Sequence, residues 1–182
     1  MTGIDWEELA LQIGSLRDDP VLGKHERGGN EIARKALELI LSEEVMREAV
    51  DYYVEGGSGG ETVLSVLRLL RPLSAMQRCY EIYQSGADIE TRRHAVELLA
   101  HIADYRALAW AAEFLEHPDE GINVLSIWIL NNLLLTLELE QPEAFRLLLE
   151  KAEQHPSQRV RSELVDLSVR ERFEALVRDP NP

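Results

Sequence analysis

The sequence predicts an all-α fold, a right-handed α-solenoid of about five helical hairpins. The first observation behind this prediction is a repeat of about thirty residues, marked by glutamates at intervals of 30, 29 and 30 residues. A period of this length, with two helices in each unit, is typical of α-solenoids. The repeated segments are NEIARKALELI (30–40), GETVLSVLRLL (60–70), IETRRHAVELL (89–99), DEGINVLSIWI (119–129) and, after a longer gap, SQRVRSELVDL (157–167).

The second observation is that helical periodicity runs through the whole chain, with no alternating run long enough to indicate a strand. Residues 1–17 are therefore assigned to an N-terminal helix, formed over 4–17, in which Trp6 and Leu9 begin an apolar stripe. The segment 23–30 is predicted to be a polar loop. Residues 1–182 are expected to form one domain.

Five hairpins are expected after this loop, separated by glycine and proline residues that end helices. The paired helices are predicted at 31–41 with 43–55, 60–70 with 73–85, 89–102 with 104–116, 120–138 with 142–154, and 157–168 with a short helix at 169–178. The corresponding repeats span 30–56, 59–86, 88–117, 119–155 and 157–178.

The second helices of the first four hairpins also align with one another. Apolar residues follow the first stripe position at three, four and seven residues, which places them on one face of a helix. No single hairpin can bury such a stripe, so neighbouring copies are expected to stabilise each other. The first stripe positions are Met46, Met76, Leu108 and Phe145.

The net charge of −14 argues against nucleic acid and anionic membrane as partners. With 33 acidic and 19 basic residues, a basic or neutral protein is the more plausible partner. An equally good interpretation of the excess of acidic residues is that it only keeps the protein soluble.

The chain offers no candidate membrane span, because the apolar segment 127–137 is short and contains two asparagines. The first 17 residues show no signal or transit peptide. A single cysteine, Cys79, excludes an internal disulfide framework. A cytoplasmic location is expected on these grounds.

Two segments resemble the first helix of HEAT-like repeats: RVRSELV after Pro156 and TRRHAVELL after Glu90. The short spacing is similar to the bacterial HEAT-like type that is also found in phycobilin lyase relatives. The second and fourth repeats depart from that family, because they have Leu64-Ser65 and Asn123-Val124 at the positions where the family has a Val-Arg pair. The resemblance implies a protein-binding scaffold whose second helices line the concave side.

No catalytic, cofactor-binding or metal-binding residues are predicted. The glycine-rich segment 55–61 follows a helix rather than a strand and lacks a lysine, so it is interpreted as a linker and not a phosphate loop. Cys79 lies on an apolar stripe without an activating base. His94 and His101 share a helix without a third ligand, and His117 and His155 precede prolines, where a turn role is ordinary.

The candidate binding residues lie opposite the apolar stripe. A residue five positions after the first stripe position points roughly 150° away from the centre of the stripe. The residue at this position is acidic in four successive hairpins. Trp110, two positions after the first stripe position, is also predicted to point outward and is a candidate hot spot for protein binding. The predicted protein-binding residues are Asp51, Glu81, Trp110, Glu113 and Glu150.

Purely structural interpretations of these residues also stay open. Acidic residues in one slot of successive helices are also expected on any solvent-exposed helix face. Trp110 could instead pack against Phe114 or under the end of a neighbouring helix. The first helices carry more arginine and lysine, so the two sides are expected to differ in sign.

The sequence thus predicts a non-enzymatic interaction scaffold that binds a protein, ideally a basic one, without a cofactor. One alternative is an immunity or antidote protein that masks a basic toxin. Another is a bilin-lyase-like or cofactor-attachment subunit. The sequence leaves the oligomeric state open, including whether Leu133, Leu134 and Leu135 lie in the core or form a dimer contact.

Overall fold

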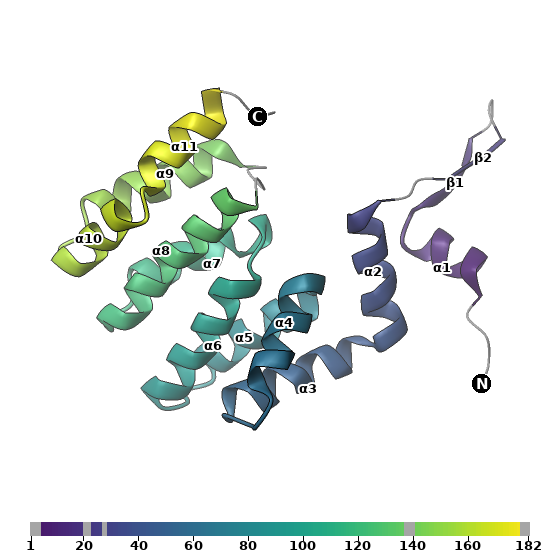
Figure 1. The fold of residues 1–182 in the computed structure, drawn as a ribbon, viewed down its shortest axis with the longest axis horizontal. Helices are drawn as coiled ribbons and strands as arrows, with labels where there is room; N and C mark the ends of the chain where they lie inside the picture. The colour runs from purple at the N-terminus through teal and green to yellow at the C-terminus, as the bar shows by residue number, and fades with distance from the viewer. Residues whose placement is uncertain (1–4, 20–22, 27–28, 137–140, 179–182) are drawn as a thin grey trace.

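The computed structural model describes residues 5–19, 23–26, 29–136 and 141–178 (Figure 1). From residue 30 onward these residues form a stack of helical hairpins, which confirms the predicted all-α repeat solenoid. The first helices of the hairpins are α2 (Asn30–Leu41), α4 (Gly60–Leu70), α6 (Ile89–Ile102), α8 (Glu120–Leu135) and α10 (Gln158–Asp166). The second helices are α3 (Glu43–Val54), α5 (Leu73–Gln84), α7 (Leu108–Leu115) after the 3₁₀ turn η1 (Tyr105–Ala107), α9 (Pro142–Glu153) and α11 (Val169–Arg178).

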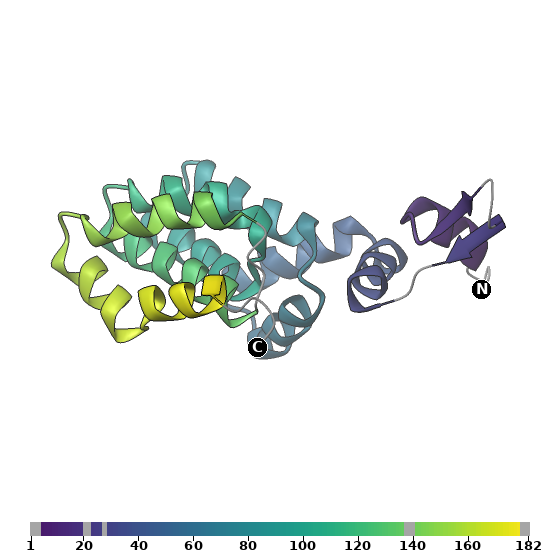
Figure 2. The ribbon, with the colours of Figure 1, turned by 90° about the horizontal axis from the view of Figure 1, so that it is seen from above.

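The hairpins stack into two layers (Figures 1 and 2). Helices α4, α6, α8 and α10 pack on one another in the first layer, and α3 packs on α5 and α7 on α9 in the second. The helix ends fall within two residues of the predicted ones, except that α7 begins at 108 rather than 104 because η1 occupies 105–107. The predicted end of α8 at 138 lies outside the described residues.

The N-terminal segment differs from the prediction. Instead of a helix over 4–17 and a polar loop at 23–30, it forms α1 (Trp6–Gln12) and a two-stranded antiparallel hairpin of β1 (Leu16–Asp19) and β2 (Gly23–Glu26). The prediction of a chain without strands was therefore wrong here. Gly14 ends the helix because it adopts the left-handed backbone conformation (φ 72°), which glycine tolerates.

The core lies between the two layers and contains the predicted apolar stripes. All four first stripe positions are buried, as are most positions three, four and seven residues later. Helix α8 is buried on nearly all sides because α6, α7, α9, α10 and α11 surround it. Leu133 and Leu134 belong to this core, whereas Leu135 at the helix end is exposed.

Polar side chains fix where the later first helices begin. The Asp119 carboxylate accepts a hydrogen bond from the backbone N–H of Ile122 at 3.1 Å, and the Ser157 hydroxyl accepts one from Val160 at 3.3 Å. Such caps satisfy backbone donors that have no partner within the helix. They set the register of α8 and α10 against the preceding hairpin.

A histidine followed by a proline precedes each of these two caps. His117 Nδ1 accepts a hydrogen bond from the Asp119 N–H at 3.0 Å, and His155 Nδ1 accepts one from the Ser157 N–H at 3.1 Å. Only an unprotonated Nδ1 can accept, so the turn at His117 requires neutral imidazole. The ordinary turn role predicted for these histidines is confirmed.

We expect mild acid to destabilise the fold through His117. Burial lowers the pKa of His117, with Arg92 acting in the same direction and Asp119 and Glu113 opposing it. Because the unfolded chain then binds the proton more readily than the folded one, the stabilisation is present above the unfolded pKa of about 6.5 and is lost as the pH falls toward the lower folded pKa.

The measurement is the free energy of unfolding by urea between about pH 7.5 and 5.5, the range in which an ordinary histidine titrates. His117→Asn should reduce the pH dependence, while the same change at the exposed His94 should retain it. An unaltered pH dependence in His117→Asn would contradict this role.

Candidate protein-binding surface

The five predicted binding residues all lie on second-layer helices, and we call the outward side of α3, α5, α7 and α9 the second-helix surface. Asp51 is on α3, Glu81 on α5, Trp110 and Glu113 on α7, and Glu150 on α9. Glu81 and Glu113 are exposed, and the other three are half-buried. Their side chains do not form one uninterrupted acidic column, because neighbouring helices supply partners for them.

Asp51 and Glu81 are joined by arginines in a network between α3 and α5. Arg78 Nε donates to Asp51 Oδ1 at 2.8 Å and Arg78 Nη1 to Glu81 Oε2 at 3.3 Å. Arg47 Nη1 donates to Glu81 Oε1 at 3.0 Å. The Arg47 hydrogen bond lowers the pKa of Glu81, and the Asp51 hydrogen bond raises the pKa of Arg78. These two acids therefore hold adjacent repeats together, and much of their charge is balanced locally.

Trp110 and Glu113 meet around Tyr80, a residue of the preceding repeat. The Trp110 and Tyr80 rings are stacked, with centroids 4.9 Å apart and planes 13° from parallel. The Tyr80 hydroxyl donates to Glu113 Oε2 at 2.5 Å, and this bond raises the pKa of Tyr80 to about 12. The hypothesis that Trp110 lies under a neighbouring helix is confirmed in part, since one face of its ring is covered by Tyr80 and its side chain remains half-buried.

Glu150 stands apart from the other four, near the C-terminal end of the stack. It lies within electrostatic range of Arg170 on α11, whose guanidinium donates to both oxygens of Glu153 at 2.7 and 2.6 Å. Lys151 bridges α9 to α7 by an ion pair with Glu116. The acids of α9 are thus also partly neutralised by neighbouring helices.

The sequence analysis did not identify Arg47, Arg78 and Tyr80 as residues that make contacts between repeats. A signal for them exists, because each of their contacts spans roughly one repeat: 34 residues from Arg47 to Glu81, 27 from Asp51 to Arg78, and 33 from Tyr80 to Glu113. Opposite charges about one period apart mark the Arg47–Glu81 and Asp51–Arg78 pairs, whereas the neutral Tyr80 carries no such signal.

The two layers differ in the size of their charge and not in its sign, so the prediction of opposite signs was wrong. The second helices from α3 to α9 contain nine acidic and four basic residues, whereas the first helices from α2 to α10 contain eight acidic and seven basic residues. The second-helix surface is therefore the more negative side even after its internal ion pairs are counted.

The second-helix surface also carries an exposed apolar side chain on the helix next to α7. Leu147 on α9 occupies the position equivalent to Trp110 on α7, the helix on which α9 packs, and 63% of its surface is exposed. Aromatic residues are enriched at the centres of protein interfaces, and polar groups lie around them.

The other motifs have structural roles. Cys79 is fully buried, and this burial raises the pKa of its thiol, so the interpretation as a packed thiol is confirmed. The glycine-rich segment links α3 to α4, and Gly57 lies so close to Tyr52 that an added Cβ would come within 2.5 Å of the ring. No cluster of three metal-binding side chains occurs among the residues that the structure describes.

Within the described part of the chain, none of the helices combines the length and apolar character that a membrane span requires.

Comparison with known proteins identifies the repeat. A family model described as HEAT repeats matches residues 77–167, which is half of the chain. No curated protein and no solved structure matches the chain. The similarity to phycobilin lyase relatives is not confirmed, since the match is to HEAT repeats in general. The matched region includes α6 to α10, the stack whose hairpins carry Trp110 and Glu113. The chain belongs to the HEAT repeat family.

Proposed function

We propose that this protein is a non-enzymatic scaffold that binds a protein partner through the second-helix surface, at the apolar centre formed by Trp110 and Leu147. HEAT repeats are generally protein-interaction scaffolds and typically lack catalytic activity. The observation that carries the proposal is that Leu147 is exposed on α9, which packs on the helix that carries the stacked Trp110. Solvent-facing apolar and aromatic side chains within a polar rim are typical of binding sites.

The charge of this surface favours a basic partner. Glu81, Glu113 and Glu150 lie on three successive helices of this surface, and acids outnumber bases on this layer. Complementary charge would accelerate encounter, whereas the apolar centre would supply most of the affinity. A basic toxin is one partner of this kind, so the antidote hypothesis is a special case of the proposal.

The experiment compares Leu147→Glu with Leu69→Glu. Both leucines are well exposed, at 63% and 69%, but Leu69 lies on α4 in the first layer. Partners captured by the tagged wild-type chain are identified by mass spectrometry, and the affinity of the purified partner is then measured. We expect Leu147→Glu to weaken binding roughly tenfold or more, as for a hot-spot residue.

Leu69→Glu should bind like the wild type, and both variants should keep their helical circular dichroism. Equal affinity of all three proteins for the partner would refute the proposed surface. Weakening by Leu69→Glu alone would assign binding to the first-helix layer instead.

Asp51 and Glu81 are poor choices for such a test, although both belong to the predicted site. Reversing either charge would place a lysine against Arg78 and disturb the contact between α3 and α5. Glu150→Lys is the better probe of charge, because α9 retains its buried contacts. We expect this change to lower the association rate and its dependence on salt.

A further inference from the structure

Arg34 on α2 lacks the partner that the arginines aligned with it have in other repeats. The aligned residues of the third and fifth repeats are Arg93 and Arg161. Arg93 donates to both oxygens of Asp119, the residue that caps the next first helix, at 2.9 and 2.6 Å, and Arg161 donates to backbone carbonyl oxygens of the preceding turn. The cap that corresponds to Asp119 for Arg34 is Gly59, which has no side chain. Arg34 accordingly forms no hydrogen bond or ion pair with any residue that the structure describes.

Arg34 faces a cavity of about 320 Å³ between α2, the C-terminal end of α4 and the turn that contains η1. The cavity has walls from three successive hairpins, so residues as far apart in the chain as Arg34 and Asp104 line it together. Arg106 Nη2 donates to the Arg71 carbonyl oxygen at 3.1 Å, which ties η1 to the end of α4. A volume of this size is at the lower end of the range for ligand sites, so it suits a small molecule or a single terminal group.

The charges that line this cavity leave an excess of one positive charge. Its side chains include four bases and three acids, namely Arg34, Lys35, Arg71 and Arg106, and Glu31, Glu38 and Asp104. Each acid already accepts hydrogen bonds: Glu31 from Lys35 at 2.7 Å, Glu38 from the Ser74 N–H and hydroxyl at 3.1 and 2.7 Å, and Asp104 from Arg106 at 2.9 Å. In a chain with a net charge of −14, such a local excess of positive charge favours an anion.

Two further side chains give the cavity a neutral donor and an apolar wall. The Tyr105 hydroxyl has no hydrogen-bond partner within the part of the chain that the structure describes, and a phenolic O–H can donate to an anion. Leu70, at the end of α4, is buried and also lines the cavity. A ligand that fits these walls carries one negative group on a short apolar body.

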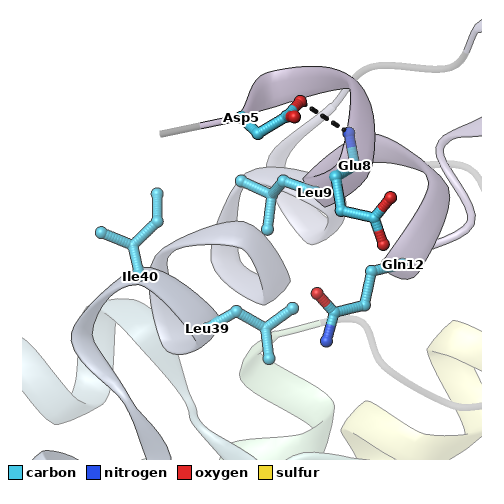
Figure 3. A pocket seen from close by; sticks show the side chains of 6 residues that line it. All are labelled: Asp5, Glu8, Leu9, Gln12, Leu39 and Ile40. Atoms are coloured by element: carbon cyan, nitrogen blue, oxygen red, sulfur yellow. Dashed lines mark hydrogen bonds between the residues drawn. The ribbon is translucent and has the colours of Figure 1, made fainter. Parts of the chain in front are cut away.

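A second cavity that borders α2 lacks these features. Figure 3 shows Leu39 and Ile40 of α2 near Leu9 of α1, with the acidic side chains of Asp5 and Glu8 around the same space. None of the described residues that line it is basic. An anion would therefore be repelled there, and the two cavities beside α2 differ in the ligands that they favour.

We propose that the cavity between α2, α4 and η1 binds a carboxylate group, held by the Arg34 guanidinium and the Tyr105 hydroxyl. A guanidinium can bind a carboxylate through two parallel N–H···O bonds. A single carboxylate also balances the one excess positive charge, whereas a phosphate group with a charge of about −1.5 to −2 would exceed it. A small organic acid and the C-terminus of a peptide both present this group. The site is separate from the second-helix surface and goes beyond the proposed function.

Titration calorimetry of the purified full chain with hydrocinnamate tests the proposal, and hydrocinnamamide is the uncharged control. We expect saturable binding of the acid and at least about tenfold weaker binding of the amide, which cannot form a charge-assisted pair. Arg34→Met should weaken binding of the acid by at least about tenfold, and Tyr105→Phe by about three- to tenfold. Arg68→Met, at an exposed arginine of α4 outside the cavity, should bind the acid like the wild type.

The tripeptide Gly-Gly-Phe distinguishes the two sources of the carboxylate. Tighter binding of this peptide than of hydrocinnamate would assign the site to a peptide C-terminus, and the reverse order would assign it to a small organic acid. The absence of saturable binding by both acids would overturn the proposal, as would equal binding of hydrocinnamate and its amide or an unchanged affinity in Arg34→Met. Circular dichroism checks that each variant is folded, and none of these outcomes depends on the second-helix surface.

Discussion

Replacement of Phe114 by alanine is expected to lower the free energy of unfolding by about 3–5 kcal/mol, the range for a fully buried phenylalanine. Phe114 is 0% exposed, and its ring meets the edge of Tyr83 with centroids 4.7 Å apart. The centroid of its ring also lies 6.2 Å from that of Tyr80, the residue that stacks on Trp110. The cavity would open between α5 and α7, so the loss would affect the contact between two repeats as well as the core.

Chemical denaturation followed by circular dichroism measures this effect. Phe114→Leu preserves most of the apolar volume and should cost about 1–2 kcal/mol. A double-mutant cycle with Tyr83→Leu should show coupling of about 0.5–1.5 kcal/mol, as expected for an aromatic pair. A loss below about 1 kcal/mol for Phe114→Ala would contradict the packing described for this joint.

Replacement of Asn123 is expected to have the second largest effect. Its buried side-chain Nδ2 lies 2.9, 3.1 and 2.7 Å from the carbonyl oxygens of Phe114, Leu115 and His117, so its two N–H groups are shared among three acceptors. The Phe114 oxygen also accepts from the His117 N–H, and the Leu115 oxygen lies near His155 Nε2. Asn123→Ala therefore removes the donor to the buried His117 oxygen and weakens the end of α7, which should cost about 1–3 kcal/mol.

Asn123→Asp separates hydrogen bonding from size. Aspartate has the same shape but cannot donate when ionised, and its charge would face the carbonyl oxygens, so it should be the more destabilising change at neutral pH. Asn131→Ala, at a half-buried asparagine of the same helix, should change stability by less than about 1 kcal/mol. Equal effects of Asn123→Ala and Asn131→Ala on urea denaturation would contradict a specific role for Asn123.

Asn123 also shows what the repeat pattern does and does not specify. It occupies a slot where HEAT-like repeats carry one of the paired Val-Arg residues, and the sequence alone presents it only as a departure. The structure supplies the reason: the side chain closes the turn between α7 and α8, where His155 Nε2 also lies 3.1 Å from the Leu115 oxygen. A local hydrogen-bonding role cannot be inferred from periodicity, because its acceptors come from a different helix.

The hairpins from residue 30 onward were predictable because each repeats the same stripe and ends at glycine, proline or a capping residue. The N-terminal segment was not, since it occurs once and has no copy with which to align it. Trp6 and Leu9 have helical spacing, yet Trp6 is 65% exposed and Gly14 breaks the helix before the strands begin. Strands of four residues are too short for alternation to be read with confidence from one sequence.

The candidate surface was predictable in its position and not in its internal contacts. The slot opposite the apolar stripe correctly placed Glu81 and Glu113 at the exterior. It could not show that Arg78 lies between Asp51 and Glu81, because side-chain pairing depends on the offset between stacked repeats. The internal pairing shifts the emphasis of the proposed site from the acids of α3 and α5 toward Trp110 and Leu147.

The proposed surface makes protein binding separable from folding in this chain. The core residues that stack the hairpins point between the layers, while the exposed Leu147 and the outer edge of Trp110 are free to contact another molecule.

Hydrogen exchange of the full chain, with and without its captured partner, tests the central proposal most directly. The proposed surface predicts added protection in α7 and α9, around Trp110 and Leu147, with little change in the exposed parts of α4 and α6. Protection confined to the first-layer helices, with α7 and α9 unchanged, would contradict binding through the second-helix surface.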